Sequence, residues 1–400
     1  MTIAESVPHA MSLAQSLGYG FLIVAIVGCL FTLAAAGCVL SFPDEDMETS
    51  DTQPPVTVLK PLHDAEPDLP SRLAAFHRQD YRAPIQVLCG THRHESSAAA
   101  VVRTMKSSLP DDGIELVVEP RSHGVNRKVS NLINMMPKAR HDTLVLSDSD
   151  IVVGPGYLRT LTALLESPGV GLVTCLYYGI GGEALWTRLS ALAINLQFLP
   201  QAITAVSLGL AKPCCGATIA MRRSMLDRIG GFGALADVLA DDHAIGLAVR
   251  SAGYDVVTAP FLVGHRCFEG SLRQLVRHQI RVARTIKSIY PLAYAGTIVT
   301  HPWPLSLLAM LSGSEAAFMV AIAVLLSRIL LCGSVEWRFG LPRQNYWLVP
   351  VHDLIAFAIY VTSFFGATVY WRGADYRVAS NGKLIEGDGK LVEGQDLSRS

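Results

Sequence analysis

The feature that most constrains the fold is an uncharged run of 23 residues from Gly18 to Leu40. A helix of this length crosses the roughly 30 Å of hydrocarbon in a bilayer. A cleaved signal peptide is the competing interpretation, but this run is longer than the apolar part of such a peptide and no basic segment precedes it. We therefore predict a membrane anchor over residues 1–42.

Composition supports a membrane protein that also has a large water-facing part. Half of the 400 residues are apolar and only 17% are charged. The formal net charge of −1 gives no reason to expect nucleic acid as a partner. The eight cysteines include no CxxC pair, so their spacing does not suggest a zinc or redox site. Reduced thiols fit a cytosol-facing protein best.

The middle of the chain has the pattern of an α/β domain. Residues 43–55 are acidic and contain proline, which predicts a solvated linker. From residue 56 to about 290, short apolar runs alternate with helical patterns, which favours a doubly wound parallel sheet. The expected strands are Val56–Leu59, Ile85–Cys89, Ile114–Glu119, Thr143–Leu146, Gly169–Thr174 and Tyr254–Ala259.

Three further segments concern the membrane. Glu183–Leu210 is strongly apolar and predicts either a helix in the membrane interface or a buried core helix, broken at Pro200. Residues 291–372 contain two long apolar runs and predict a C-terminal transmembrane region whose number of spans stays open. These runs are interrupted by the polar residues Glu315, Arg328, His352 and Asp353.

The basic residues Arg284, Lys287, Arg372 and Arg377 flank this region, which places both of its ends on the cytoplasmic side. Residues 373–400 repeat GKLIEG as GKLVEG and are expected to form a disordered tail.

The stretch most informative about function is His141–Val153. Thr143–Leu146 predicts a buried strand, and Asp148 and Asp150 follow it at once. Ligands bind at the carboxyl ends of strands in open α/β sheets, and two such carboxylates can share Mg²⁺ or Mn²⁺ that bridges a pyrophosphate. An ordinary turn rich in Asp and Ser explains the same residues, so the rest of the chain must decide.

Two more segments carry candidate groups. Asp241 and Asp242 begin a predicted helix, where they could be helix caps or could supply a general base. Phe268–Tyr290 is a predicted helix dense in cations, which could face lipid or could clamp the phosphates of a substrate.

Four motifs occur in a fixed order: NRKVSNL at Asn126–Leu132, DSD at Asp148–Asp150, ADD at Ala240–Asp242, and HQIR at His278–Arg281. This series resembles the ceramide glucosyltransferase family of inverting glycosyltransferases, which includes bacterial hopanoid-associated glycosyltransferases. The resemblance covers residues 18–377. It implies an α/β GT-A nucleotide-diphospho-sugar transferase domain over residues 56–290, with one N-terminal and two or more C-terminal transmembrane helices.

The resemblance also implies roles for individual residues. Asp148 and Asp150 would bind the metal and the diphosphate, with Asp150 the more direct ligand. Asp242 would be the base that takes the acceptor proton, and Asp241 would support it. The remaining implied contacts with the nucleotide, the diphosphate or the acceptor channel are Lys60, Asn126, Lys128, Gln279 and Arg281.

Two positions depart from the family pattern. The aspartate expected after the second strand is absent, and Glu95 is the only acidic residue in Gly90–Ser97 that could stand in for it. Val282 follows Arg281 where the family has tryptophan, which affects the expected shape of the acceptor channel.

The expected function is therefore transfer of glucose or N-acetylglucosamine from a UDP-sugar to the hydroxyl of a membrane lipid, with a divalent cation, Mg²⁺ or Mn²⁺, as cofactor. The acceptor would be ceramide or a hopanoid, and the location a bacterial inner membrane with the active site on the cytoplasmic side. Alternatives are a polyprenyl-phosphate or processive polysaccharide glycosyltransferase, and a degenerate member that binds nucleotide or lipid without catalysis. The sequence leaves the oligomeric state open.

Overall fold

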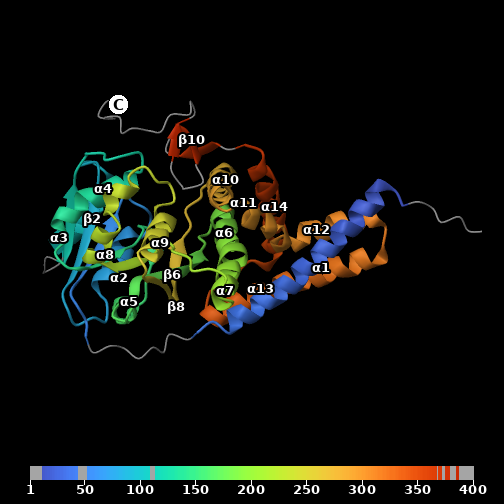
Figure 1. Cartoon of the computed structure of the whole chain (residues 1–400), viewed down its shortest axis with the longest axis horizontal. Coiled ribbons are helices and arrows are strands. Elements are labelled where there is room, and N and C mark those ends of the chain that lie inside the picture. The colour runs from blue at the N-terminus through green and yellow to red at the C-terminus, as the bar shows by residue number, and fades with distance from the viewer. Residues whose placement is uncertain are drawn as a thin grey trace, which may run out of the picture.

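The structure is a computed structural model that describes residues 11–43, 52–108, 113–366, 368–371, 374–378 and 384–386. An α/β domain forms one end of the molecule, and the helices α1, α12 and α13 extend away from it at the other (Figure 1). The helices α6, α7, α10 and α14 lie between these two parts. An α/β part and a group of long helices can therefore be distinguished in the overall shape.

The α/β domain is built on an eight-stranded sheet with the strand order β3-β2-β1-β4-β7-β6-β8-β5. Its strands are β1 Val56–Pro61, β2 Ile85–Thr91, β3 Ile114–Val118, β4 Thr143–Leu146, β5 Ile151–Val152, β6 Val170–Ile180, β7 Ile219–Arg222 and β8 Asp255–Arg266. Six strands run in one direction, whereas β7 is antiparallel to β4 and β6, and β5 is antiparallel to β8.

The prediction of a wholly parallel sheet is therefore wrong for β5 and β7. The chain leaves β6 at the carboxyl edge of the sheet, forms α6 and α7, and enters β7 from that same edge. A strand that starts where its neighbour ends must run in the opposite direction. As a result, the loop before β7 lies beside the carboxyl ends of the parallel strands.

Helices cover both faces of the sheet. The apolar sides of α2, α3 and α5 bury one face, and those of α4, α8 and α9 bury the other. Their bounds are α2 Leu69–His77, α3 Ser97–Ser108, α4 Arg127–Met135, α5 Tyr157–Leu165, α8 Arg223–Arg228 and α9 Asp241–Ser251, with the 3-10 turns η1 Met136–Lys138 and η3 Phe232–Leu235. The sheet is thus buried except at its edges, and ligand-binding groups collect at the carboxyl edge.

Two strands are longer than expected. β6 continues to Ile180 and β8 to Arg266, past the predicted ends at Thr174 and Ala259. The extensions begin with the buried apolar residues Cys175, Leu176, Phe261 and Val263, and that of β8 ends in the polar residues His265 and Arg266. They are held by pairing with each other, as far as Ile180 opposite Arg266.

Pro200 does not break the helix that contains it. Helix α6 (Leu185–Leu192) passes through a π-helical turn, η2 (Ala193–Phe198), directly into α7 (Leu199–Ser207). The wider turn accommodates a proline, whose ring and missing N–H do not fit a regular helix interior. One side of this helix packs against α1 and α13, so it is buried on that side.

Four helical segments in the described part of the chain are long and apolar enough to cross a membrane. They are α1 Leu13–Leu40, the segment Leu185–Ser207, α13 Glu315–Phe339, and η6 Tyr346–Leu348 with α14 Val349–Phe364. The remaining helices are α10 Leu272–Ile289, α11 Pro291–Gly296, η4 Thr297–Thr300, α12 Pro302–Ala309 and η5 Met310–Ser312. The expected N-terminal and C-terminal apolar helices are confirmed.

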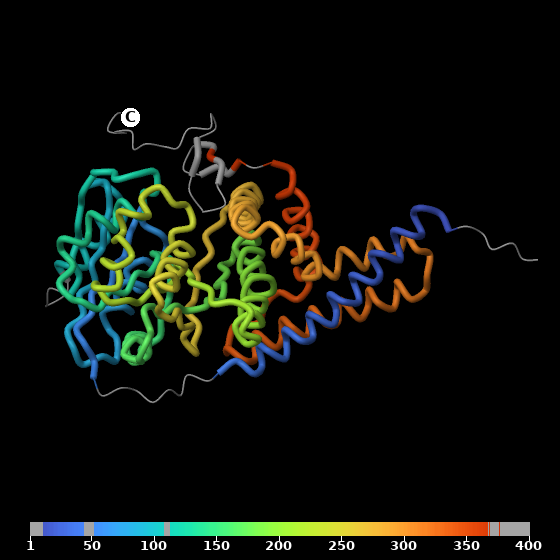
Figure 2. The backbone as a smooth tube through the Cα atoms, viewed as in Figure 1, coloured from blue at the N-terminus to red at the C-terminus, as the bar shows by residue number. Residues whose placement is uncertain are grey.

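Helix α1 packs along helices from the other end of the chain. It lies against α12 and α13 (Figure 2). Gly28 allows close approach to η4, since a Cβ atom there would lie 2.4 Å from the Val299 carbonyl oxygen. Arg338 at the end of α13 donates a hydrogen bond of 3.1 Å to the carbonyl of Phe42, just past α1. This hydrogen bond links α13 to the end of α1 that lies nearer the sheet.

The C-terminal end differs from the prediction. The last apolar helix ends at Phe364 and not at Trp371, because Thr368–Trp371 forms the strand β9. β9 pairs with β10 (Ala374–Val378), which pairs with β11 (Leu384–Glu386), so parts of the expected disordered tail form an antiparallel sheet. Arg372, the second copy of the repeat, and most of the acidic linker lie outside the described residues.

Candidate active site

A buried lysine holds the acidic turn, Ser147–Asp150, that follows β4. Lys60 has no exposed surface, and its Nζ donates to Ser147 Oγ at 3.3 Å and to the Asp148 carbonyl oxygen. Burial lowers the pKa of Lys60 to about 8, although Asp150 and Asp148 favour its charged form. The buried ammonium therefore holds the turn, and the expected contact of Lys60 with a nucleotide stays a prediction.

Lys128 joins the two acidic motifs. Its Nζ lies 2.8 Å from Asp148 Oδ1 and 3.5 Å from Asp241 Oδ2. Burial disfavours the ammonium, but Asp148 and then Asp241 outweigh this and raise the pKa of Lys128. A cation so placed holds carboxylates from two distant parts of the sequence at one point.

Asn126 fixes the position of Lys128. Its side chain caps α4 by accepting hydrogen bonds from the backbone N–H groups of Lys128 and Val129. Its amide also donates to the Val238 carbonyl at 2.8 Å and to Asp241 Oδ1 at 3.3 Å. Asn126 is buried and organises the site through these contacts, and its expected contact with a nucleotide stays a prediction.

Asp150 is paired with a residue that sequence reasoning missed. His265 Nε2 lies 3.2 Å from Asp150 Oδ2, and the Arg266 N–H donates to the Asp150 carbonyl at 2.9 Å. Burial opposes the charge on each partner, but their interaction lowers the pKa of Asp150 and raises that of His265. His265 lies in the part of β8 beyond its predicted end, and its place at the carboxyl end of a strand is the signal that could have revealed it.

The second acidic motif meets the first around Gly216. Asp242, in the first turn of α9, accepts a hydrogen bond of 3.0 Å from the Gly216 N–H. A Cβ atom on Gly216 would lie 3.3 Å from Lys128 Nζ, 3.4 Å from Asp242 Oδ2 and 3.5 Å from Asp148 Oδ2. The structure therefore brings both sets of carboxylates to one small space at the carboxyl edge.

We predict that Gly216→Ala lowers sugar transfer by about 10- to 100-fold, because a misplaced reacting group costs up to about that much in rate. The new methyl group would occupy the space between Asp148 and Asp242, while the N–H that binds Asp242 remains. The backbone needs no positive φ at this position, so the melting temperature should change little. Steady-state kinetics and thermal unfolding would be measured side by side with Gly154→Ala, whose Cβ would meet nothing within 4 Å. Equal activity of the two variants would contradict the prediction.

The residues of the acidic turn fit a divalent cation. Asp150 Oδ1 is buried and has no hydrogen-bond partner among the described residues. Carboxylate oxygens are the ligands that Mg²⁺ and Mn²⁺ prefer, and Mg²⁺ commonly takes its other ligands from water and substrate phosphates. Within the described ranges no group of three or more His, Cys, Asp or Glu side chains is arranged to hold a metal. The carboxylates of the acidic turn could thus bind a divalent cation whose remaining ligands would come from water and a substrate diphosphate.

Tyr177 is a second residue that sequence reasoning missed. Its ring stacks on Phe198 at 4.5 Å between ring centroids and lies 5.5 Å from the ring of His265. Burial raises the pKa of Tyr177 well above its usual value, and Cys215, Asp242 and the two carboxylates of the acidic turn add to this effect. Tyr177 therefore forms part of the wall beside both acidic motifs.

Other predicted site residues make no hydrogen bond or ion pair with this centre among the described residues. Glu95 is exposed in the loop after β2, and its side chain has no hydrogen bond or ion pair among the described residues. Gln279 and Arg281 are half-buried on α10, and the structure gives neither a hydrogen bond nor an ion pair with the acidic motifs. Burial lowers the pKa of Arg281. Val282, where the family has tryptophan, is 41% exposed.

Helix α10 touches the site at its C-terminal end. The ring of Tyr290, which follows α10, packs edge-on against His243 at 5.4 Å, next to Asp242. The side of α10 that bears Val276, Ile280 and Ala283 packs against α14. The helix thus connects the surroundings of Asp242 with the apolar region.

Two of the basic residues on α10 form hydrogen bonds with backbone groups of the protein. Arg284 donates to the carbonyls of Phe365 and Thr368, and Lys287 donates to those of Ser363 and Gly366. The Ser363 and Phe365 carbonyls lie at the end of α14, where a helix has no internal partners for them, whereas that of Gly366 lies between α14 and β9 and that of Thr368 at the start of β9. Neither a phosphate clamp nor lipid contact is needed to explain these two residues.

We predict that Arg284→Met lowers the free energy of unfolding by about 1.5–3 kcal/mol, the usual contribution of hydrogen bonds to a charged group. Transfer kinetics of the folded fraction should remain close to those of the unchanged protein. Thermal unfolding in detergent would be compared with that of Arg273→Met, a control at an exposed position of the same helix. A large loss of activity in Arg284→Met without loss of stability would instead favour a phosphate clamp.

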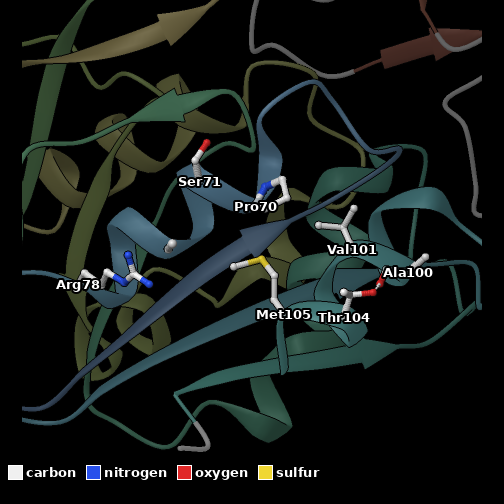
Figure 3. Close-up of a pocket in the computed structure, with 8 residues that line it drawn as sticks. Pro70, Ser71, Arg78, Ala100, Val101, Thr104 and Met105 are labelled. Atoms are coloured by element: carbon white, nitrogen blue, oxygen red, sulfur yellow. Dashed lines mark hydrogen bonds between the residues drawn. The ribbon is translucent and has the colours of Figure 1, made fainter. Parts of the chain in front are cut away.

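A groove lies apart from the acidic site. It has a volume of about 600 Å³ and is lined by Pro70, Ser71, Ala74, Arg78, Ala100, Val101, Thr104 and Met105 of α2 and α3 (Figure 3). None of the predicted site residues belongs to this lining. The groove is therefore not the place where the acidic motifs would bind a substrate.

The sequence profile of glycosyl transferase family 21 matches residues 20–384, which is most of the chain. The chain belongs to glycosyl transferase family 21. Two curated relatives in *Caenorhabditis elegans* are similar to this family 21 protein.

Ceramide glucosyltransferase 1 is 25% identical over 242 residues, which cover 58% of this chain and 52% of that protein. Ceramide glucosyltransferase 3 is 19% identical over 355 residues, which cover 83% of this chain and 74% of that protein. The chain thus spans about half the length of the first relative.

A solved structure shares the architecture of this family 21 protein. A mannosyltransferase from *Pyrobaculum calidifontis*, in complex with GDP-Man and Mn²⁺, superposes with a TM-score of 0.51 at 20% identity. The match covers 88% of this chain and 99% of the mannosyltransferase. The GT-A fold, a nucleotide-sugar transferase fold, is confirmed, and the chain is a member of a glycosyltransferase family.

Proposed function

We propose that this family 21 protein is an inverting glycosyltransferase that moves a sugar from a UDP-sugar to a hydroxyl of a membrane lipid. The observation that carries the proposal is the convergence of Asp148 and Asp242 on the space beside Gly216. An inverting transfer needs a base at the acceptor hydroxyl and positive charge at the departing diphosphate, which the arrangement can supply within one site.

In the proposed reaction, Asp242 takes the proton of the acceptor hydroxyl while the acceptor oxygen attacks the anomeric carbon. The bond between that carbon and the diphosphate oxygen breaks, and the nucleotide leaves with the electron pair. The Gly216 N–H and the helix N-terminus orient and stabilise the Asp242 carboxylate. No covalent sugar–enzyme bond is required, so no Ser or Cys nucleophile is assigned.

Asp148 and Asp150 would hold a divalent cation, which when bound supplies positive charge to the diphosphate. Lys128 keeps Asp148 in place, and His265 does the same for Asp150. Asp241 supports the arrangement through Lys128 and Asn126. Each of these contacts sets the position of an oxygen before a donor arrives, which is what electrostatic catalysis requires.

A lipid acceptor is supported by the place of the site in the fold. The helices α6, α7, α10 and α14 lie between the sheet and the long apolar helices (Figure 1). Tyr177, next to the acidic motifs, packs against both the core of the sheet and the apolar cluster of α1, α7 and α13. The similarity to ceramide glucosyltransferases favours ceramide and glucose, with a hopanoid and N-acetylglucosamine as further candidates.

The test is a transfer assay with membranes that contain the protein, a panel of labelled UDP-sugars, and mass spectrometry of the extracted lipids. The expected product is one sugar on one lipid, formed with inversion at the anomeric carbon. A polymer would favour a polysaccharide synthase, and a sugar on polyprenyl phosphate would favour the corresponding transferase. A protein that binds UDP but forms no product from any donor would favour a non-catalytic role.

A further inference from the structure

Two opposite charges are buried among the apolar helices, far from the acidic motifs in sequence. Arg328 on α13 binds Asp353 on α14 through both carboxylate oxygens, at 2.8 and 2.7 Å, and each side chain is only 3% exposed. His352 lies 3.0 Å from the same carboxylate. Charges in apolar helices are costly and often mark a functional group, so this pair calls for an explanation beyond packing.

Arg328 also makes a contact outside this pair. Its Nη1 donates to the carbonyl of Leu196 at 3.2 Å, within the π-helical turn η2. In a regular helix this carbonyl would accept from the N–H of the residue four positions later, which is Pro200 and has none. Arg328 thus supplies the hydrogen bond that the proline cannot.

The π-helical turn is in turn attached to the sheet. Asn195 is buried and pairs with both backbone groups of Gly179 on β6, accepting from its N–H at 2.7 Å and donating to its carbonyl at 3.0 Å. A Cβ atom on Gly179 would lie 2.7 Å from Ala191 Cα, so the helix and strand touch through their backbones. The position of the turn therefore sets the position of the end of β6.

The same turn contacts the wall of the acidic site. Phe198 is the last residue of η2, and its ring stacks on Tyr177 of β6. Tyr177 packs on His265, whose Nε2 meets Asp150 Oδ2. An unbroken series of contacts therefore runs from the ion pair between α13 and α14 to a carboxylate of the candidate cation site.

We propose that Arg328 is a positioning residue for sugar transfer: by holding the Leu196 carbonyl, it keeps the helix in its π-helical register and thereby places Asn195 against β6 and Phe198 against Tyr177. Loss of the π-turn would shift the register of one part of this helix relative to the other, so Asn195 and Phe198 could not both keep their partners. The apolar helices would thus set the geometry at Asp150. This inference depends on the proposed function only for the measurement of UDP binding.

The variant for the test is Arg328→Met with Asp353→Leu. Removing one partner alone would leave an unpaired buried charge, whereas replacing both by apolar residues of similar size is often neutral for stability. The double variant removes the donor to the Leu196 carbonyl without leaving a buried charge. A second form of it adds Pro200→Ala, which restores an N–H to that carbonyl within a regular helix.

Two readouts are needed, because a stabilising role alone would also affect folding. The first is backbone hydrogen exchange in a peptide that contains Gly179, with a peptide from β1 as the internal reference. The second is calorimetric binding of UDP in the presence of Mn²⁺. The exchange measurement does not depend on the identity of the donor, so failure of UDP to bind even the unchanged protein would count against the proposed function and not against this inference.

In the double variant, exchange at Gly179 should rise about tenfold, as expected for a local opening that has become easier. UDP binding with Mn²⁺ should weaken by about three- to thirtyfold, the usual range of coupling through a packed network. The melting temperature of both forms should stay close to that of the unchanged protein. Adding Pro200→Ala should restore neither readout, because the regular helix has lost its π-turn. Normal readouts in the double variant, or their recovery after Pro200→Ala, would overturn the inference.

If the double variant fails to fold, Asn195→Ala tests the same inference at the contact between the π-helical turn and β6. This change leaves Arg328 and Asp353 paired but removes the clamp on Gly179. It should raise exchange at Gly179 and weaken UDP binding to the same extent as predicted above. Unchanged UDP binding in folded Asn195→Ala would show that the π-turn does not position the site.

Discussion

Asp242→Asn should reduce sugar transfer by at least a hundredfold while UDP binding stays within about threefold of normal, because general base catalysis contributes about 10²–10⁴ in rate. Asparagine has almost the same shape as aspartate and can still accept the Gly216 N–H with its amide oxygen. It cannot take a proton from an acceptor hydroxyl. The variant therefore separates the chemical step from donor binding.

The measurement combines turnover with labelled donor and calorimetric binding of UDP with Mn²⁺. Asp142→Asn is the matched control, because its side chain is 93% exposed and lies before β4, at the opposite edge of the sheet from Asp242. This control should behave like the unchanged protein. Near-normal turnover in Asp242→Asn would remove the assignment of this residue as the base.

Asp150→Asn should instead weaken donor binding that depends on a divalent cation. Its loss removes a buried carboxylate with one oxygen that has no hydrogen-bond partner in the described structure. We expect the Mn²⁺ concentration needed for half-maximal activity to rise about 10- to 100-fold, the effect typical of changes in the immediate surroundings of a metal. Turnover at saturating Mn²⁺ should fall less than in Asp242→Asn.

The experiment titrates Mn²⁺ after removal of metal with EDTA, and it measures both turnover and UDP binding. His265→Gln is the informative companion, since glutamine can still donate a hydrogen bond to Asp150 but carries no charge. Its requirement for Mn²⁺ should change in the same direction and by less. An Asp150→Asn variant with an unchanged requirement for Mn²⁺ would contradict the proposed role.

Local sequence patterns predicted much of this arrangement. The apolar run of β4 followed by Asp148 and Asp150 gave the correct place for the first acidic motif, because a buried strand must end at an edge of the sheet. Asp241 and Asp242 were correctly expected at the start of a helix. The two motifs are separated by about ninety residues, and their meeting at Gly216 depends on how the strands are ordered.

What the sequence did not reveal depends on non-local contacts. The direction of β7 follows from where α7 returns the chain, which no short window of residues encodes. His265 was missed because β8 continues past its apolar part through pairing with β6. The resemblance gave Lys60 only as a contact of the nucleotide, and its burial beneath the acidic turn depends on acceptors that lie almost ninety residues later in the chain.

Pro200 illustrates the same limit in one residue. By itself, proline predicts the end of a helix, because it lacks an N–H and crowds the preceding turn. The helix nevertheless continues, and Arg328, over a hundred residues later, donates to the Leu196 carbonyl, for which Pro200 has no N–H. A rule based on neighbouring residues could not have anticipated that partner.

The bond between Arg338 and the Phe42 carbonyl has a consequence for biosynthesis. A ribosome makes α1 first and α13 almost three hundred residues later, so the whole α/β sheet is translated before α1 can meet α12 and α13. During that interval the side of α1 near Gly28 lacks its final neighbours. Ribosome-bound chains that stop before α12 should therefore be the form most readily recognised by membrane quality-control proteases.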